Sequence, residues 1–278
     1  MRAFTAGHRN LAIGAMALLA TAAMAGLAWT QRRPSEYNTL QAVVQRLSQG
    51  NALGKQPLAF SITSGTASAQ LAEQRGLCKA DQCDFFAQLD PYHRYGNGWD
   101  ELVRQGYVMG DIQGWSVSSG TVLLPRATFR AYGPRLGYLS CTVAHEIAHI
   151  QRHHVFQQTY YDSHALRQLQ GQQKEHQSLA KARELELEAD REAADMMARS
   201  GFRGRVCLDD LVFMHKSVGD GTPTEADSTH PGYEERIAAM KAHYLQLERR
   251  PLQPQPSTAG SFRYDRQDNL LTFVPQRQ

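Results

Sequence analysis

The sequence predicts an α+β fold that is mainly α-helical, with a small antiparallel sheet placed before one central helix. Apolar residues recur at helical spacing over residues 35–49, and the run 184–199 is rich in strong helix formers. Residues 107–124 alternate weakly and are rich in Val, Trp and Thr, which is typical of strands. The length of 278 residues, with 42% hydrophobic and 21% charged residues, fits a globular protein of one large or two small domains.

Residues 1–30 are predicted to direct export. Arg2 and Arg9 precede an uncharged, Ala- and Leu-rich segment at residues 11–29. The segment fits a signal peptide, with residues 23–25 (Ala-Met-Ala) as a cleavage site, and it is also just long enough for a membrane anchor. Both interpretations stay open. We expect an exported protein that is either periplasmic or anchored in the inner membrane through this segment, facing the periplasm.

Charge and cysteine content narrow the class of protein further. The net charge is only +3 and no basic run is interleaved with aromatic residues, so nucleic acid is not expected as a partner. The cysteines Cys78, Cys83, Cys141 and Cys207 fit an exported protein whose thiols oxidise. A local Cys78–Cys83 bridge would leave Cys141 to pair with Cys207 and tie the central helix to a later one. The alternative, in which all the thiols are reduced, stays open.

The elements before the central helix follow from periodicity and turn residues. We expect a helix at residues 35–49, ended by Gly50, and a strand at 57–62. A short helix at 67–75 and a hairpin with strands at 107–117 and 121–124 should follow. An exposed edge of that hairpin could hold an extended peptide through backbone hydrogen bonds. A purely structural hairpin explains the pattern equally well.

The central helix is expected to begin at Gly137 and to run through His154. The polar segment 157–181 that follows is either a solvated helix or a mobile cover. Three further helices are expected at residues 184–199, 207–217 and 230–248. A terminal hairpin is expected, with strands at 262–264 and 270–273.

The central helix carries the run His145-Glu-Ile-Ala-His149, whose histidines stand at i and i+4 on one helix face. That spacing lets both imidazoles bind one zinc ion, with the intervening glutamate in reach of its water. A catalytic zinc site needs a third protein ligand. The helix expected at 184–199 offers Glu184, Glu186, Glu188, Asp190 and Glu192. Of these, Glu186 could bind the metal, and Asp190, one turn further on the same face, could accept a hydrogen bond from the outer nitrogen of a ligand histidine. Without the motif, residues 184–199 would be interpreted as a charged helix face.

Three groups of residues together resemble a known family. They are His145-Glu-Ile-Ala-His149 with Arg152 and His154 behind it, Glu186-Leu-Glu-Ala-Asp190, and Ser228-Thr-His-Pro231 with Arg236-Ile237. In this order they look like the zinc metallopeptidases that include the CAAX prenyl protease, the membrane protease HtpX and the periplasmic protease-chaperone BepA. The resemblance covers about residues 107–240. It implies a zincin-like metalloprotease domain that binds one Zn²⁺ per chain.

The resemblance also implies a role for each site residue. His145, His149 and Glu186 would bind the metal, and Asp190 would accept a hydrogen bond from a ligand histidine without binding the metal itself. Glu146 would act as the general base that activates a zinc-bound water.

Two later residues complete the implied site. Arg236 would stabilise the transition state or position the substrate. His230 could occupy the open coordination position and hold the enzyme inactive. Taken without the family, His230 before a proline is a helix-entry residue.

We therefore expect a zinc-dependent endopeptidase that hydrolyses peptide bonds in misfolded or envelope proteins. The alternatives are a zinc-bearing chaperone or quality-control adaptor with latent peptidase activity, and a metal-stabilised binding domain without catalysis. The expected organisation is a signal peptide or anchor at 1–30, a metallopeptidase domain at 31–250 and a tail with a short hairpin at 251–278. Within the family that it resembles, we expect this chain to be a member with one N-terminal apolar segment and no helical repeats.

Overall fold

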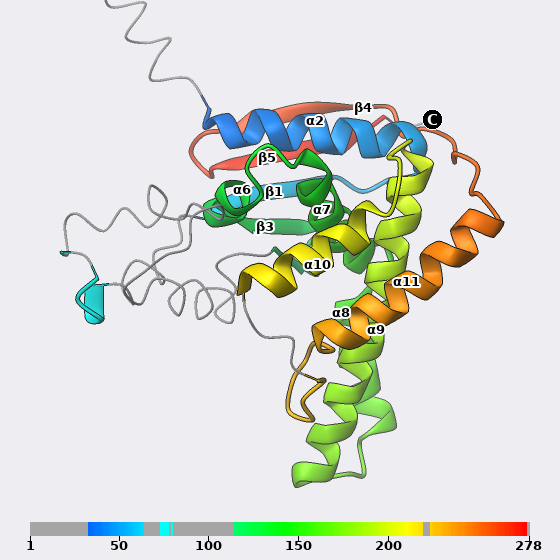
Figure 1. The fold of residues 1–278 in the computed structure, drawn as a ribbon. Coiled ribbons are helices and arrows are strands. Elements are labelled where there is room, and N and C mark those ends of the chain that lie inside the picture. Colours follow the sequence, from blue (N-terminus) through cyan, green and yellow to red (C-terminus); the bar gives the residue numbers. More distant parts are fainter. Residues whose placement is uncertain (1–32, 64–72, 78, 80–113, 219–222, 277–278) are drawn as a thin grey trace, which may run out of the picture. The chain divides into compact units, whose positions relative to one another are not determined.

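The computed structural model describes residues 33–63, 73–77, 79, 114–218 and 223–276, which Figure 1 draws in colour. The expected signal or anchor segment, most of the expected helix at 67–75 and the Cys78–Cys83 pair lie outside these ranges. The described residues from Glu36 onward belong to one compact unit. Among the described helices, none is both long enough and apolar enough to cross a membrane.

Within the described residues, five strands form one sheet in the order β2-β3-β1-β5-β4. Their bounds are β1 Leu58–Thr63, β2 Trp115–Val117, β3 Thr121–Pro125, β4 Gly260–Asp265 and β5 Leu270–Pro275. The expected α+β fold is confirmed. β2 and β3 form the expected hairpin, but residues 107–113 of its expected first strand lie outside the described residues, and that strand is seen only at Trp115–Val117. The sheet is mixed, however, because β1 runs parallel to β3, whereas the other neighbours are antiparallel. The long connection between β1 and β3 supplies the crossover that parallel neighbours need.

The C-terminal hairpin, β4 and β5, is part of this sheet, and helix α2 (Ser35–Gly50) lies close to it (Figure 1). The apolar face of α2 is buried, which explains why its helical spacing could be recognised in the sequence. Tyr37 on α2 donates a 2.5 Å hydrogen bond to the Asn269 carbonyl and accepts one of 3.0 Å from the Ile62 amide. This hydroxyl connects the first described helix to β1 and to the turn between β4 and β5.

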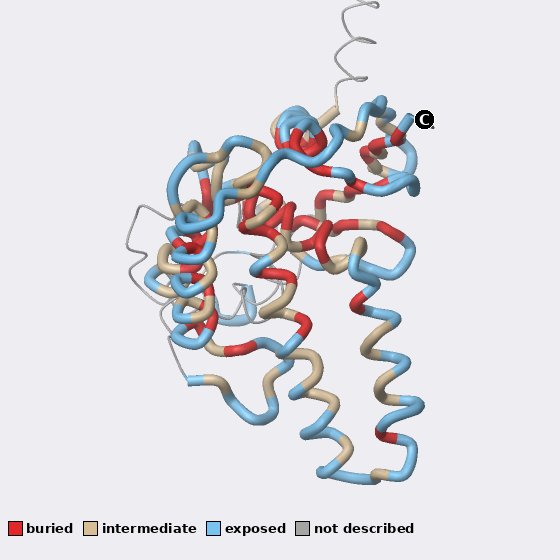
Figure 2. The backbone as a smooth tube through the Cα atoms, turned by 90° about the vertical axis from the view of Figure 1, so that its right-hand side faces the viewer, coloured by how far each residue is buried: buried red, intermediate tan, exposed pale blue. Residues whose placement is uncertain are grey.

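The remaining helices carry the site. Their bounds are α6 Arg126–Tyr132, α7 Leu136–Gln151, α8 His154–Tyr160, the π-helical turn η1 Tyr161–Ala165, α9 Gly171–Arg199, α10 Val206–Val218 and α11 Tyr233–Arg249. α7 packs against both α9 and α10, and α11 crosses α9 and α10 (Figure 1). Buried residues concentrate on the sheet, α7 and the end of α9 that contacts it (Figure 2).

The central helix ends at Gln151, three residues before its expected end at His154. His153 adopts the left-handed backbone conformation, with φ of 56°, so the chain cannot continue the helix and α8 starts in a new direction. An interpretation based on apolar periodicity does not detect such a residue, because the sequence on both sides remains helix-prone.

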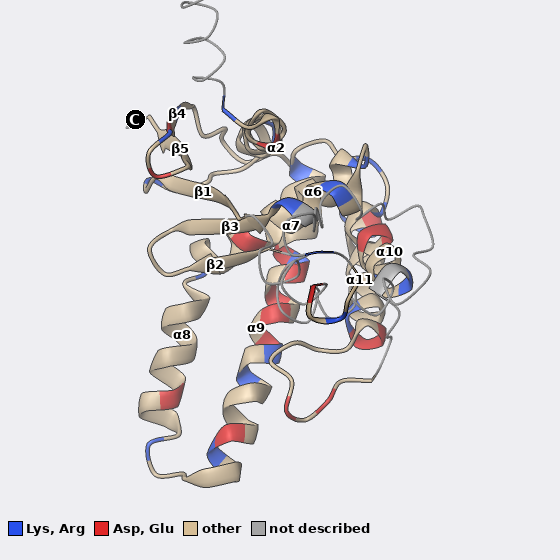
Figure 3. Cartoon of the chain, turned by 90° about the vertical axis from the view of Figure 1, so that its left-hand side faces the viewer, with Lys and Arg blue, Asp and Glu red and all other residues tan. Residues whose placement is uncertain are grey.

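Residues 154–183 form a helical arm made of α8, η1 and the first part of α9. The two helices run beside each other away from the sheet (Figure 3), and Gln158 joins them by donating to the carbonyl and hydroxyl oxygens of Ser178 at 3.1 and 3.0 Å. Most residues of the arm are exposed or half-buried. Of the two interpretations of residues 157–181, the structure therefore supports the solvated helix.

A disulfide joins Cys141 on α7 to Cys207 on α10, as expected. It closes a loop between positions 66 residues apart. Closing a loop of this length restricts the unfolded chain and stabilises the fold by about 3–4 kcal/mol. The bridge fixes α10 against the helix that carries the histidine pair.

Candidate metal centre

α7 and α9 bring His145, His149 and Glu186 together. The two Nε2 atoms lie 3.0 Å apart, and Glu186 oxygens lie 3.2 Å from Nε2 of His145 and 3.3 Å from Nε2 of His149. Zinc with bonds of about 2.0–2.1 Å in a tetrahedral arrangement separates its ligand atoms by about 3.3 Å. These residues are the one group of His, Cys, Asp and Glu found within the described residues that could hold a metal ion.

The polar atoms of this group fit a metal ion because the protein leaves them without good partners. Glu186 Oε2 is buried and has no hydrogen-bond partner among the described residues. Two imidazole nitrogens facing each other at 3.0 Å also share at most one proton, so a cation between them and the carboxylate satisfies all three groups. The donor set of two imidazoles and one carboxylate is one that zinc takes in catalytic sites.

Asp190 supports His145 from the next turn of α9. Its Oδ1 lies 3.1 Å from His145 Nδ1, close enough for an ion pair although not aligned as a hydrogen bond. Burial would lower the pKa of His145, but the carboxylates of Asp190 and Glu186 raise it to about 10. A metal ion must displace this proton, so binding should release it.

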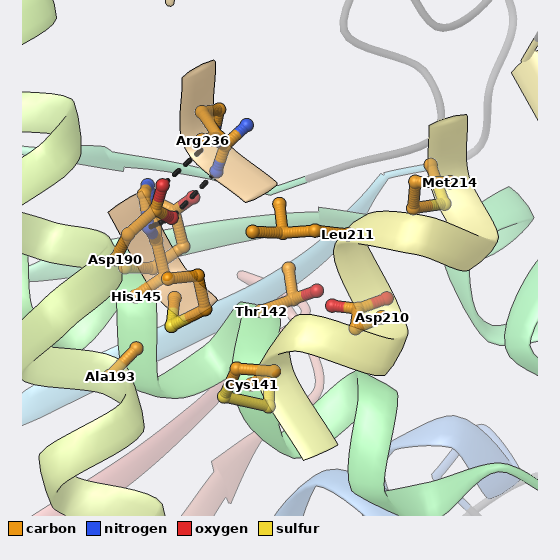
Figure 4. A pocket seen from close by; sticks show the side chains of 12 residues that line it. Cys141, Thr142, His145, Asp190, Ala193, Asp210, Leu211, Met214 and Arg236 are labelled. Atoms are coloured by element: carbon orange, nitrogen blue, oxygen red, sulfur yellow. Dashed lines mark hydrogen bonds and ion pairs between the residues drawn. A yellow bond between two sulfur atoms is a disulfide. The ribbon is translucent and has the colours of Figure 1, made fainter. Parts of the chain in front are cut away.

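Arg236 on α11 binds Asp190 through two nitrogens of its guanidinium group (Figure 4). Its Nε and one terminal nitrogen donate to the two carboxylate oxygens at 2.8 and 2.7 Å. Both side chains are buried, and the guanidinium holds the pKa of Asp190 well below its usual range despite the opposing effect of burial. The resemblance implies a role for Arg236 at the substrate. In the structure it holds the residue that orients His145.

Glu146, the candidate general base, is 5% exposed and points toward strand β2. Burial raises its pKa, and a hydrogen bond from Ser116 on β2 opposes that rise. A side chain at position 114 would meet this arrangement directly, because a Cβ there would lie 3.2 Å from Glu146 Cγ and 2.8 Å from Leu124 Cδ2. Gly114 therefore allows β2 and Glu146 to come close together.

His230 lies at the rim of the centre, in the segment before α11. Its Nε2 is 3.5 Å from Glu186 Oε2, and its side chain is 54% exposed. Nδ1 shares a 2.9 Å hydrogen bond with the Thr229 hydroxyl. His230 is thus beside the third ligand but not one of the three residues of the metal-binding group.

His154 is a further site residue to which the sequence alone gave no role. It is buried, and its Nδ1 lies 3.0 Å from Nδ1 of His149, with the two rings at 89°. If His149 binds metal through Nε2, its Nδ1 carries the proton and donates it to His154. Burial lowers the pKa of His154 to about 4, so the ring is neutral and able to accept that bond. In the sequence, its one signal was its place behind the histidine pair, among the residues that carry the family resemblance.

We predict that His154→Leu weakens zinc binding about 10- to 100-fold, because the ring of His149 loses the partner that orients it. His154→Gln should restore much of the affinity, since its amide oxygen can accept the same proton. Chelator competition measures both, with His164→Leu on the exposed arm as the control. Equal affinity in the leucine variant and the wild type would contradict this role.

A small cavity lies behind His145 and Asp190, between α7, α9, α10 and α11 (Figure 4). Its volume of about 40 Å³ suffices for a few water molecules. Asp210 on α10 lines it, buried, with Oδ1 lacking a hydrogen-bond partner among the described residues, and burial raises its pKa to about 8. Sequence patterns did not single out Asp210, because its surroundings form only when four helices pack.

Comparison with protein families independently supports a zinc site at these residues. Residues 113–243 match peptidase family M48. No curated protein and no solved structure matches the chain. The matched segment runs from β2 into α11 and includes every residue of the candidate centre. Peptidases of this family depend on zinc, and the residues gathered here can bind it. Residues 113–243 therefore match a family of zinc metallopeptidases, and this match indicates a zinc metalloprotease.

Proposed function

We propose that the chain is an endopeptidase that binds one Zn²⁺ and cleaves peptide bonds in misfolded or envelope proteins. The observation that carries the proposal is the position of Glu146, a buried carboxyl on the same helix as two imidazoles that converge with Glu186. A metal site that only stabilised a fold would fill its coordination sphere and would not need a buried base beside it.

Each residue has a defined task in the reaction. His145, His149 and Glu186 would hold the zinc ion, which would polarise the scissile carbonyl and lower the pKa of a bound water to about 7. Glu146 takes the proton of the attacking water and returns it to the leaving amine. The raised pKa of Glu146 makes it a better base than an exposed glutamate.

His230 and strand β2 also contribute to peptide-bond hydrolysis. His230, exposed at the rim, donates a hydrogen bond to the oxygen that becomes negative as the carbonyl is attacked. Strand β2 is at the edge of the described sheet, and it lies against Glu146 through Ser116. An extended substrate adds to this edge through backbone hydrogen bonds, which suits unfolded chains rather than folded ones.

The test combines metal analysis with chelator-sensitive cleavage of casein, an unfolded protein. We expect about one zinc per chain, loss of cleavage with a strong chelator, and recovery when zinc is returned. Glu186→Ala is the matched control and should bind no stoichiometric zinc. Cleavage that continues after complete zinc removal would contradict the proposal.

A second function, a quality-control adaptor with latent peptidase activity, is favoured by the position of His230. Its Nε2 lies 3.5 Å from Glu186 Oε2, so its ring is next to the metal-binding group. His230→Ala distinguishes the two functions. A latched enzyme gains casein cleavage in this variant, whereas an open enzyme loses the proposed hydrogen-bond donor and slows.

We also propose that the protein is exported and acts in the periplasm or at the inner membrane through its N-terminal segment. The Cys141–Cys207 disulfide supports this location, because such bridges persist in oxidising compartments. The apolar segment of residues 11–29 supplies the export signal or anchor.

A further inference from the structure

We propose that a pocket between β2 and α8 binds one large apolar side chain of the substrate and so selects the cleavage site. The inference rests on the proposed function. The pocket is lined by Ser116, Val117, Ser118, His149, Ile150, His153, Val155 and Phe156. It involves neither the metal-binding atoms nor the cavity behind Asp190.

The pocket adjoins the reacting groups at two points. Ser116 lines it and also donates a hydrogen bond to Glu146. His149 lines it and also belongs to the metal-binding group. A substrate strand on the edge of β2 that places its carbonyl beside Glu146 therefore carries a neighbouring side chain over this pocket.

The lining suits an uncharged, apolar group. No Asp, Glu, Lys or Arg is among the residues that form it, although all four types occur nearby on α9. Val117 is 37% exposed, Val155 44% and Phe156 67%, which leaves apolar surface facing solvent at the pocket mouth. The volume of about 60 Å³ holds roughly four water-sized groups, comparable to the carbons of a leucine side chain.

The fold presents Phe156 at this position rather than burying it. The left-handed turn at His153 separates α8 from α7, and the buried ring of His154 anchors the start of α8 beside the metal-binding group. The next two residues, Val155 and Phe156, line the same pocket as residues of β2. Phe156 stacks on Tyr160 with 6.0 Å between ring centres, and this contact restricts its movement. Exposed apolar residues of this size, placed beside a reactive centre, mark a binding surface.

The first measurement maps cleavage sites of unfolded casein by mass spectrometry. We expect a large apolar residue at one fixed position relative to the scissile bond. Two fluorogenic peptides that differ only there, Leu against Asp, then report kcat/KM for wild type, Phe156→Ala and Val117→Ser. Both variants should lose about tenfold in kcat/KM on the Leu peptide and change little on the Asp peptide. Leu245→Ala is the matched control, because Leu245 on α11 is also an exposed apolar residue, with an exposure between those of Val117 and Phe156.

A second measurement does not depend on turnover. Binding of the labelled Leu and Asp peptides to the Glu146→Gln protein is followed by fluorescence anisotropy, with and without Phe156→Ala. We expect tighter binding of the Leu peptide, and loss of that difference in the double variant. Zinc content should be unchanged throughout, because the pocket lies outside the metal-binding atoms.

The outcomes separate this inference from the function on which it rests. If the wild type cleaves and binds both peptides equally well, the proposed role of the pocket is wrong while the endopeptidase assignment remains. The same holds if Phe156→Ala lowers kcat/KM equally on both peptides. Full cleavage by Glu146→Gln overturns the endopeptidase mechanism instead. A preference at the fixed position that is abolished by Phe156→Ala and kept by Leu245→Ala supports the pocket.

Discussion

Replacing Glu146 by Gln is expected to leave zinc bound and to lower casein cleavage by about two to four orders of magnitude. The substitution keeps the size of the side chain and its contact with Ser116 but removes the oxygen that accepts a proton. General-base catalysis by a positioned carboxylate contributes an acceleration of that order. Metal analysis and the initial rate of casein cleavage, measured on the same preparation, check the prediction.

The control for this variant is Glu184→Gln, on the same protein and with the same change in chemistry. Glu184 is an exposed residue of α9 that pairs with Lys181 at 3.0 Å, so its replacement should leave both zinc content and rate unchanged. Cleavage by Glu146→Gln at the wild-type rate would show that another group takes the proton. Loss of zinc in that variant would instead place Glu146 among the residues that hold the metal.

The parts of the site that could be predicted from the sequence are those set by local helix geometry. The spacing of His145 and His149 places both on one face whatever the rest of the chain does. Glu186 and Asp190 share a face of α9 for the same reason, and the structure brings that face to α7. The position of α2 followed from apolar periodicity, because its buried face repeats at helical spacing. The second half of α9 followed from its strong helix formers, whereas its start at Gly171 lies in the segment expected to be either a solvated helix or a mobile cover.

The parts that could not be predicted depend on long-range packing or on single backbone conformations. The parallel pairing of β1 with β3 joins segments far apart in the sequence, and no local pattern determines its direction. The left-handed backbone at His153 decides where α7 ends and therefore where His154 and Phe156 lie. The partner of Arg236 is likewise decided by how α11 crosses α9, which no spacing within one helix determines.

Arg236→Ala is expected to destabilise the fold by about 3–5 kcal/mol, the cost of leaving one partner of a buried ion pair uncompensated. Asp190 would keep its buried position but lose both of its short hydrogen bonds from the guanidinium. Among the described residues, its negative charge would then be balanced by His145, whose orientation would change. Urea unfolding measures the loss, and chelator competition measures the accompanying fall in zinc affinity.

The matched control is Arg205→Ala, which removes an Arg–Glu pair of the same two-bond geometry, with distances of 2.8 and 3.0 Å to Glu248, from an exposed position. Solvent already screens that pair, so its loss should change stability much less. The double variant Arg236→Ala with Asp190→Ala tests the mechanism itself, because removing both charges should cost less than the sum of the two single changes. If Arg236→Ala instead unfolded like the wild type and bound zinc normally, but failed to cleave casein, the guanidinium would act on the substrate. The resemblance alone implies that second role, whereas the buried pair with Asp190 favours the first.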